Sequence, residues 1–362
     1  MKRYLVLENG DVFEGEAFGA PVSGDVLSEI VFTTAMTGYL ETVTDKSYKG
    51  QSVVQTFPLI GNYGVIPEDR EGDVPSVSAY IVREVCEEPS NFRCQLTLDD
   101  YLKSHGIPGL KGIDTRALTM VLRTRGVMNG LITDSYPSDT AAALAAIASY
   151  KITDPVSSVT VPAVEEHDSD ENRLTVAMID CGVKENIVRS LNKRGCKVYL
   201  FPASSSAAEI LDVDPDGIFI SNGPGDPEDN KVTIATLREL DKTGIPTMGI
   251  CLGHQLLALA HGFRTTKLKY GHRGANHPVK DLETGRVYIS SQNHGYAVVP
   301  ESIDSDAASE MFVNVNDGTN EGIRYKNKPV FSVQFHPEAC GGPKDTDFLF
   351  DEFINMMAEG RD

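Results

Sequence analysis

The chain has 362 residues and a formal net charge of −19, with 41% hydrophobic and 23% charged residues. That length predicts about two domains, and the composition is typical of a soluble globular protein. Phosphate backbones are bound by clustered Lys and Arg, so the acidic excess argues against a nucleic-acid partner. No apolar run approaches the ~18 residues of a membrane span. Six cysteines without paired spacing predict reduced thiols in a cytoplasmic protein.

Residues 1–152 are predicted to form a mixed α/β domain. Asn9-Gly10 lies between two strand-like runs, which is a strong hairpin signal. Asp114 is the expected N-cap of a helix. Helical patterns cover residues 98–105, 114–124 and 138–150. Residues 153–173 are polar, acidic and without a hydrophobic period, so they are predicted to be a linker.

Residues 174–362 alternate between strand-like and helix-like patterns. The expected strands cover residues 174–180, 198–201, 218–221 and 247–250, and the expected helices cover residues 185–194, 231–243 and 252–260. This alternation predicts a doubly wound, mostly parallel sheet, that is, an α/β fold. Ligands of such sheets bind at the carboxyl ends of the strands, so we expect functional residues there.

One cysteine stands where a strand pattern changes to a helix pattern, in Gly249-Ile250-Cys251-Leu252-Gly253. The form G-x-C-x-G is that of a nucleophile elbow with sulfur in place of oxygen. Cys251 would lie at a helix N-terminus, where backbone N–H groups and the helix dipole favour the thiolate. An isolated cysteine is more often a small buried thiol, but the flanking glycines and the strand–helix context favour the nucleophile.

A thiol nucleophile requires a base and a group that orients the base. His336 follows a β pattern at residues 331–335, and Glu338 lies two residues further, on the same side of an extended chain. Pro337 restricts His336 to extended geometry. Taken alone, this segment would be better interpreted as a surface turn with two unrelated polar residues. The competing bases are His254, His272, His277 and His294.

The loop SNGPGDP, residues 221–227, follows another predicted strand. Its glycines and prolines would make a rigid loop that presents backbone amides. A phosphate-binding loop is disfavoured because neither GK[ST] nor G-x-G-x-x-G is present. Beside a thiolate, such amides fit an oxyanion hole, whereas out of that context the loop would be an ordinary turn.

The three segments SNGPGDP, GICLGHQ and FHPE, in this order and spacing, resemble the class I glutamine amidotransferases. The first half narrows the resemblance. Residues 31–51, 58–64, 89–93 and 112–119, together with residues 291–299, resemble the small subunit of carbamoyl-phosphate synthetase. The amidotransferases of anthranilate, GMP and aminodeoxychorismate synthesis share only the second half.

The resemblance implies a role for each matching residue. Cys251 would be the nucleophile, His336 the base and acid, and Glu338 its orienting partner. The amides of Gly223 and Leu252 would stabilise the oxyanion. The implied L-glutamine pocket, with Lys184 at its border, consists of Ser47, Gly223, Gly225, Leu252, Gln255, Asn293, Gly295 and Tyr296. Ser47 belongs to domain 1–152, which would also dock the large subunit.

The resemblance also implies the reaction and its partners. Glutamine would be hydrolysed through a thioester, and ammonia would pass to a separate large subunit that uses ATP, Mg²⁺ and bicarbonate to make carbamoyl phosphate for arginine or pyrimidine biosynthesis. The complex would be a heterodimer, with higher association left open. No metal ion or cofactor is expected in this chain. Two alternatives are a free-standing Cys-His-Glu amidohydrolase or peptidase, which leaves domain 1–152 without a role, and a non-catalytic scaffold, which the intact Cys, His and Glu disfavour.

Overall fold

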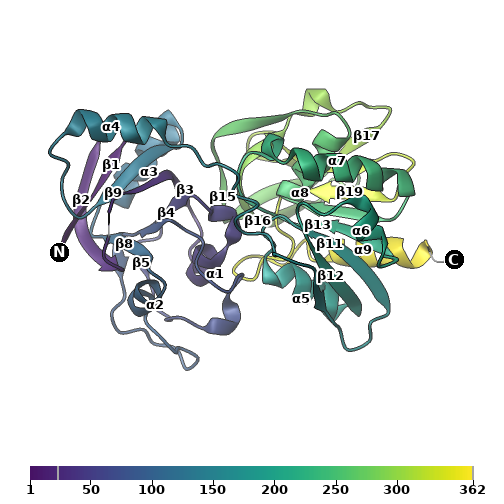
Figure 1. The fold of residues 1–362 in the computed structure, drawn as a ribbon, viewed down its shortest axis with the longest axis horizontal. Coiled ribbons are helices and arrows are strands. Elements are labelled where there is room, and N and C mark those ends of the chain that lie inside the picture. The colour runs from purple at the N-terminus through teal and green to yellow at the C-terminus, as the bar shows by residue number, and fades with distance from the viewer. Residues whose placement is uncertain (23, 361–362) are drawn as a thin grey trace. The chain divides into compact units, whose positions relative to one another are not determined.

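The computed structural model describes residues 1–22 and 24–360. The chain divides into two compact units, Met1–Thr153 and Asp154–Asp362 (Figure 1).

In the described part of the first unit, seven strands close into a barrel. In barrel order they are β1 (Lys2–Leu7), β2 (Val12–Gly19), β8 (Pro108–Lys111), β6 (Ala79–Ile81), β4 (Gln51–Gln55), β3 (Val26–Thr33) and β9 (Met128–Thr133). β3, β4, β6 and β8 pair in parallel, and the other pairs are antiparallel. Closure pairs the strand edges. The barrel was not predicted, because closure depends on pairing between segments far apart in sequence.

The local signals of the first unit are confirmed. Gly10 adopts a φ of 86° and its amide donates to Leu7 O at 2.9 Å, which closes the hairpin between β1 and β2. Asp114 caps a helix by accepting the Ala117 amide at 2.9 Å. The helices are α1 (Tyr39–Thr44), α2 (Leu98–Ser104), α3 (Thr115–Arg125) and α4 (Thr140–Ser149), the last three near their predicted positions. Two short strands, β5 (Leu59–Ile60) and β7 (Glu84–Val85), pair separately.

The described part of the second unit contains a ten-stranded sheet. In spatial order its strands are β10 (Glu165–His167), β12 (Cys196–Pro202), β11 (Leu174–Asp180), β13 (Gly217–Ile220), β14 (Thr247–Ile250), β19 (Val330–Val333), β18 (Asn320–Tyr325), β17 (Ala308–Asn314), β15 (Thr265–Asp281) and β16 (Val287–Val298). The strands from β12 to β19 are parallel, as predicted, and the others pair antiparallel. The long strand β15 gave little signal because it is mostly polar and carries Gly and Pro.

Helices cover both faces of the parallel strands (Figure 1). Val176 and Met178 of β11 pack in one core cluster with α5 (Glu185–Lys193) and α9 (Phe348–Glu359). Ala177 and Ile179 pack on the other face, with α6 (Ala207–Leu211), α7 (Lys231–Leu240) and α8 (Leu252–Ala260). A strand that is buried on both faces reads as a continuous apolar run rather than an alternating one, which is why LTVAMI predicted a parallel strand.

The structure differs from the predicted linker at residues 153–173. Nearly all of this segment belongs to the second unit, and β10 extends the sheet by pairing with β12. Val156 and Val161 are buried, the Val161 amide donates to Asp180 Oδ2 at 2.8 Å, and Thr160 Oγ1 donates to Asp180 O at 2.6 Å. The segment is held in place by two apolar side chains and by hydrogen bonds to one aspartate. These few contacts leave its overall composition polar and acidic, which is why the sequence predicted a linker.

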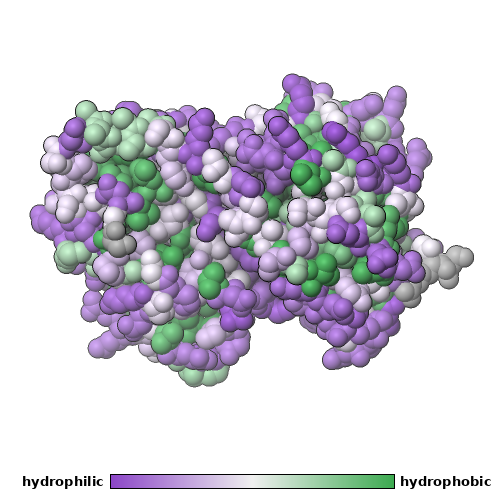
Figure 2. Space-filling model, viewed as in Figure 1, coloured by the Kyte–Doolittle hydropathy of each residue, from purple (hydrophilic) through white to green (hydrophobic). Residues whose placement is uncertain are grey.

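Hydrophilic side chains cover much of the visible face of each unit (Figure 2), in keeping with the net charge of −19. Among the helices of residues 1–22 and 24–360, none combines the length and apolar character that crossing a membrane requires.

Candidate active site

Cys251 occupies a strained turn between β14 and α8. It is 2% exposed and has φ 55° and ψ −104°. A non-glycine residue in such a conformation costs about 1–3 kcal/mol and persists only where its surroundings fix it. The Cys251 amide donates to Val333 O at 2.9 Å, and Cys251 O accepts from the Gln255 amide at 3.2 Å. The backbone at Cys251 therefore has the sharp strand-to-helix turn that G-x-C-x-G predicted.

The two glycines that flank Cys251 permit the close approach of the backbone. A Cβ on Gly253 would lie 2.2 Å from Ile220 O, and one on Gly249 would lie 2.8 Å from the backbone of Gly253. Both distances are shorter than real Cβ contacts, so α8 can pack directly on β13 and β14 only with glycine here. The N-terminus of α8 is thereby held at the carboxyl ends of the parallel strands.

His336 and Glu338 follow β19 and form a buried pair. His336 Nδ1 lies 2.6 Å from Glu338 Oε1, and both side chains are almost fully buried. A carboxylate only accepts, so the proton lies on Nδ1. His336 Nε2 has no hydrogen-bond partner among the described residues. The His336 amide donates to Ser291 O at 2.9 Å, which fixes the segment against β16. The Cys251 thiol lies 3.7 Å from Asn293 O on that same strand.

The charges of the pair depend on Cys251 and on a lysine. Burial and the Lys184 ammonium lower the pKa of His336, but Glu338 and the Cys251 sulfur raise it by more, so that pKa lies above its usual range. Burial raises the pKa of Glu338, but His336 and Lys184 lower it by more. The site thus favours a charged imidazole beside the sulfur and an ionised carboxylate behind the imidazole.

Lys184 is closer to this pair than the sequence indicated. Its Nζ lies 3.5 Å from Glu338 Oε1 and 3.3 Å from His336 Nδ1. Asn186 also contacts the segment, since its side chain donates to Glu338 O. The sequence reasoning assigned Lys184 only to the pocket border and missed Asn186. The available signal was their position just after β11, at the sheet edge that carries the other candidates.

The competing histidines have other contacts. His254 Nδ1 lies 2.8 Å from Ser332 Oγ, and burial lowers the pKa of His254 to about 3. Burial also lowers the pKa of His277 to about 4 and that of His294 well below its usual range. His272 contacts Asp317. Of the five candidates, His336 is the one whose pKa responds to Cys251.

The loop after β13 presents free backbone donors beside the elbow. Within the described residues, no group accepts a hydrogen bond from the amides of Gly223 and Leu252. These residues are neighbours, since a Cβ on Gly223 would lie 2.8 Å from Leu252 Cδ2. Ser221 fixes the start of the loop by accepting the Cys181 amide at 2.9 Å, and Gly225 continues it with a φ of 91°. Two unpaired amides, one at the N-terminus of α8 and one in the neighbouring loop, can stabilise an oxyanion together.

The residues expected to hold glutamine fall in four places. Gly223 and Gly225 lie in the loop after β13, and Leu252 and Gln255 lie on α8. Gln255 Nε2 donates to Tyr296 O at 2.8 Å and ties α8 to β16, which carries Asn293, Gly295 and Tyr296. Ser47 belongs to the first unit, in the 3₁₀ turn Lys46–Tyr48, where its amide donates to Asp45 Oδ1 at 2.9 Å. Contact of these residues with glutamine stays a prediction.

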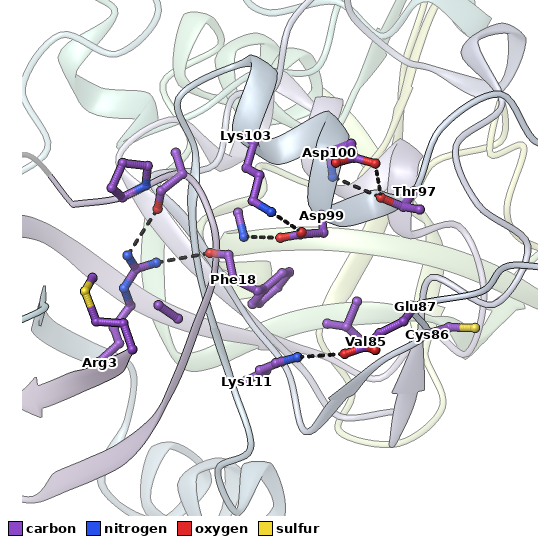
Figure 3. Close-up of a pocket in the computed structure, with 15 residues that line it drawn as sticks. Arg3, Phe18, Val85, Cys86, Glu87, Thr97, Asp99, Asp100, Lys103 and Lys111 are labelled. Carbon is purple, nitrogen blue, oxygen red and sulfur yellow. Dashed lines mark hydrogen bonds and ion pairs between the residues drawn. The ribbon is translucent and has the colours of Figure 1, made fainter.

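A cavity of about 500 Å³ lies in the first unit, and none of the candidate site residues named above lines it (Figure 3). Lys103 pairs with Asp99 and Lys111 lies 3.3 Å from Glu87 Oε1. The buried Arg3 beside it is bound by Asp134 Oδ1 at 2.5 Å. These charges neutralise one another and form no nucleophile–base pair, so the candidate catalytic groups are those around Cys251.

Comparison with known proteins identifies the family. The sequence model of class-I glutamine amidotransferases matches residues 177–356, and that of the carbamoyl-phosphate synthase small chain, CPSase domain, matches residues 5–132. The chain is 50% identical over 358 residues to the carbamoyl phosphate synthase small chain of Clostridium perfringens, covering 98% of this chain and 99% of that relative. The chain belongs to the carbamoyl phosphate synthase small chain family.

Other carbamoyl phosphate synthase small chains align equally fully. That of Methanopyrus kandleri is 47% identical over 363 residues, covering 99% of this chain and 100% of the relative. That of Bacillus cereus is 48% identical over 357 residues, covering 99% and 96%. The resemblance inferred from the motifs is confirmed for both halves of the chain.

Proposed function

We propose that this chain is the glutaminase subunit of glutamine-dependent carbamoyl-phosphate synthase. It hydrolyses L-glutamine and delivers ammonia to a separate large subunit. The observation that carries the proposal is the buried Cys251, His336 and Glu338 constellation at a strained strand–helix turn, in a chain that belongs to this family throughout its length.

The first half-reaction releases ammonia. The Cys251 thiolate attacks the side-chain amide carbon of glutamine, and the carbonyl oxygen becomes an oxyanion that the Gly223 and Leu252 amides stabilise. His336 donates its proton to the amide nitrogen, the C–N bond breaks, and ammonia leaves. The sulfur remains bound to the glutamyl group as a thioester.

The second half-reaction restores the enzyme. His336 accepts a proton from water, the hydroxide attacks the thioester carbon, and the same amides stabilise the second oxyanion. The C–S bond then breaks, and glutamate leaves with Cys251 again a thiolate. His336 transfers a proton in both halves. Glu338 raises the pKa of His336 and Lys184 lowers it, so both neighbours act on the proton that is transferred.

The synthetic chemistry is proposed to lie on the large subunit. ATP, Mg²⁺ and bicarbonate would bind there, and ammonia would reach that site without passing through water, where it would be protonated. A free-standing amidohydrolase on the same fold would need no such partner. It would leave residues 5–132, which match the CPSase domain, without a role.

The test is a Cys251→Ser variant assayed together with the large subunit. Serine keeps the size of the side chain but lacks a thiolate, so glutamine-dependent carbamoyl phosphate synthesis should fall by ~10³ to 10⁶-fold, as when a triad nucleophile is removed. Synthesis from added ammonium chloride should stay at the wild-type rate. Equal loss of both activities, or retention of the glutamine-dependent one, would refute the proposal.

A further inference from the structure

Three buried side chains on antiparallel strands of the second unit meet outside the Cys-His-Glu constellation. They are His272 on β15, His294 on β16 and Glu321 on β18, and they are 7%, 5% and 0% exposed. A potential ligand atom of each lies within 4.8 Å of those of the other two. Glutamine hydrolysis as proposed above uses none of the three.

The ring of His272 lies between two carboxylates. Its Nε2 is 2.8 Å from Asp317 Oδ2, and its Nδ1 is 3.5 Å from Glu321 Oε1. A neutral imidazole has a single N–H, so the ring can donate to one of these acceptors and presents a lone pair to the other. His272 Nδ1 and Glu321 Oε2, both buried, have no hydrogen-bond partner among the described residues.

The ring of His294 is in the same position between two acceptors. Its Nδ1 is 2.7 Å from Tyr296 O, and its Nε2 is 2.6 Å from Gln292 Oε1. The Gln292 amide cannot simply be reversed. Ser290 Oγ donates to His277 O at 3.0 Å and therefore accepts from Gln292 Nε2 at 3.3 Å, which leaves Gln292 Oε1 facing His294. One neutral ring again cannot satisfy both neighbours.

Each ring thus faces one acceptor to which it cannot donate. Either two extra protons, one on each ring, or one divalent cation would turn these contacts into favourable ones. Extra protons would place two imidazolium charges on rings whose centroids are 5.0 Å apart, in a buried site. A single cation supplies the same charge and bonds directly to the lone pairs. We propose that the chain binds one zinc ion through His272 Nδ1, His294 Nε2 and the Glu321 carboxylate, with Gln292 Oε1 adjacent to a fourth position.

The geometry and chemistry of the ligands fit zinc. Imidazole nitrogen and carboxylate oxygen bind Zn²⁺ at about 2.0–2.2 Å, so neighbouring ligands of a tetrahedral site lie about 3.3–3.5 Å apart. His272 Nδ1 and Glu321 Oε1 are at 3.5 Å. One potential ligand atom of each residue lies within 4.8 Å of those of the other two, so small side-chain movements would bring the three residues to the spacing of a zinc site.

The hydrogen bonds around the ligands are those that zinc ligands make. Metal-binding histidines usually donate their second ring N–H to a carboxylate or carbonyl, which fixes the tautomer. Here His272 Nε2 faces Asp317 Oδ2 and His294 Nδ1 faces Tyr296 O. Asn314 Nδ2 donates to Glu321 Oε1 at 2.9 Å. The ion would link β15, β16 and β18, and this site departs from the expectation that the chain holds no metal.

The experiment measures zinc on the full chain after removal of any affinity tag and of metal by a chelator. ZnCl₂ is added, free metal is dialysed away, bound zinc is measured by mass spectrometry, and affinity is measured by competition with a chromophoric chelator. Because Cys251 and His336 could also bind zinc, the Cys251→Ser variant is the matched control. About one zinc per chain is expected in both proteins.

The ligand variants decide the site. Glu321→Gln and His272→Gln should each weaken zinc binding at least tenfold, and Asp317→Asn by about 10–100-fold through the orientation of His272. Retention of wild-type affinity by Glu321→Gln, loss of zinc in Cys251→Ser, or no stoichiometric zinc in the wild type would each overturn the proposal.

If the ligand variants do not fold, the visible absorption spectrum of Co²⁺ bound to the unsubstituted chain tests the proposal instead. Visible absorption bands of tetrahedral Co²⁺ without a sulfur-to-metal charge-transfer band would support the site. A sulfur-to-metal charge-transfer band, or the absence of visible bands, would refute it.

Discussion

Three neighbouring side chains shift the pKa of His336, and they do so in opposite directions. Burial and Lys184 lower the pKa of His336, whereas Glu338 and Cys251 raise it. Lys184 Nζ is 3.5 Å from Glu338 Oε1, so the lysine and the imidazolium share one buried carboxylate. Removing that carboxylate leaves the lysine unopposed. Glu338 therefore controls both the orientation and the charge of the ring.

His336→Asn should reduce glutaminase activity more than Glu338→Gln does. The kcat values of the two variants should differ by about two orders of magnitude. Asparagine cannot transfer a proton in either half-reaction. Glutamine at position 338 leaves the ring present but lowers the pKa of His336, because the lowering effects of burial and Lys184 remain. Steady-state kinetics of both variants, measured over a pH series, test this order.

The same pH series separates the two contributions of Glu338. The residual activity of Glu338→Gln should depend on a group with a lower pKa than in the wild type. A Glu338→Gln variant as inactive as His336→Asn at every pH would show that the assigned roles are wrong or that another acid orients the base.

A second residue-scale prediction concerns stability in acid. Burial lowers the pKa of His254 to about 3, below the value of 6.5 for an unperturbed histidine. Between these values the unfolded chain binds one more proton than the folded chain, so stability rises with pH. The contribution is present above about pH 6.5 and is lost as the pH falls toward 3. The slope is about 1.4 kcal/mol per pH unit.

Wild-type stability should therefore fall by about 2 kcal/mol through His254 alone between pH 7.5 and 5.0. His254→Gln should remove that part of the pH dependence, although its stability at neutral pH will be lower. His105→Gln, which changes an exposed histidine, serves as the control and should keep the wild-type slope. Urea unfolding at several pH values gives the slopes, and equal slopes for His254→Gln and wild type would contradict the prediction.

At the scale of elements, the strand–turn–helix of β14 and α8 could be read from the sequence because it is specified locally. Gly249 and Gly253 are needed for the close approach of α8 to the strands, and the apolar run after Cys251 gives the helix its buried face. β10 and the long strand β15 could not be read. Their polar sequences become strands only through pairing with β12, β16 and β17.

Gly253→Ala tests whether packing or helix propensity dominates at this element. Alanine inside a helix is ordinarily favourable by about 1 kcal/mol relative to glycine. Here its Cβ would lie 2.2 Å from Ile220 O, and overpacking costs typically about 1–3 kcal/mol. We expect net destabilisation and a large loss of glutaminase activity, because α8 must move away from the elbow.

The control for this change is Gly360→Ala at the end of α9. The added Cβ would make only ordinary contacts there, at 3.6 Å or more, so stability and activity should stay close to wild type. Thermal unfolding and glutaminase assays of both variants give the comparison. A Gly253→Ala protein as stable and active as wild type would show that the close contact is not required.

At the scale of the whole molecule, three short motifs and the first-half segments together predicted the family, because both units carry recognisable sequence. The candidate site could be predicted where its residues follow strands directly, as Cys251 and His336 do. The contacts of Lys184 with that pair could not, since they depend on how the segment after β11 lies against the segment after β19. Barrel closure in the first unit likewise depends on pairing between distant strands.

The isolated chain should hydrolyse glutamine slowly and accelerate when the large subunit is added. One observation motivates this prediction. His336 Nε2 has no hydrogen-bond partner among the described residues, and catalytic hydrogen bonds often tighten only in the working complex.

The acceleration should be about tenfold or more in kcat/KM, corresponding to about 1.4 kcal/mol of transition-state stabilisation. Glutamate release is measured with increasing amounts of large subunit, in the absence and presence of ATP and bicarbonate. The large subunit mixed with Cys251→Ser controls for contaminating glutaminase. Full activity of the chain alone, unchanged by the partner, would contradict this coupling and favour a free-standing amidohydrolase, because such an enzyme needs no second subunit to complete its site.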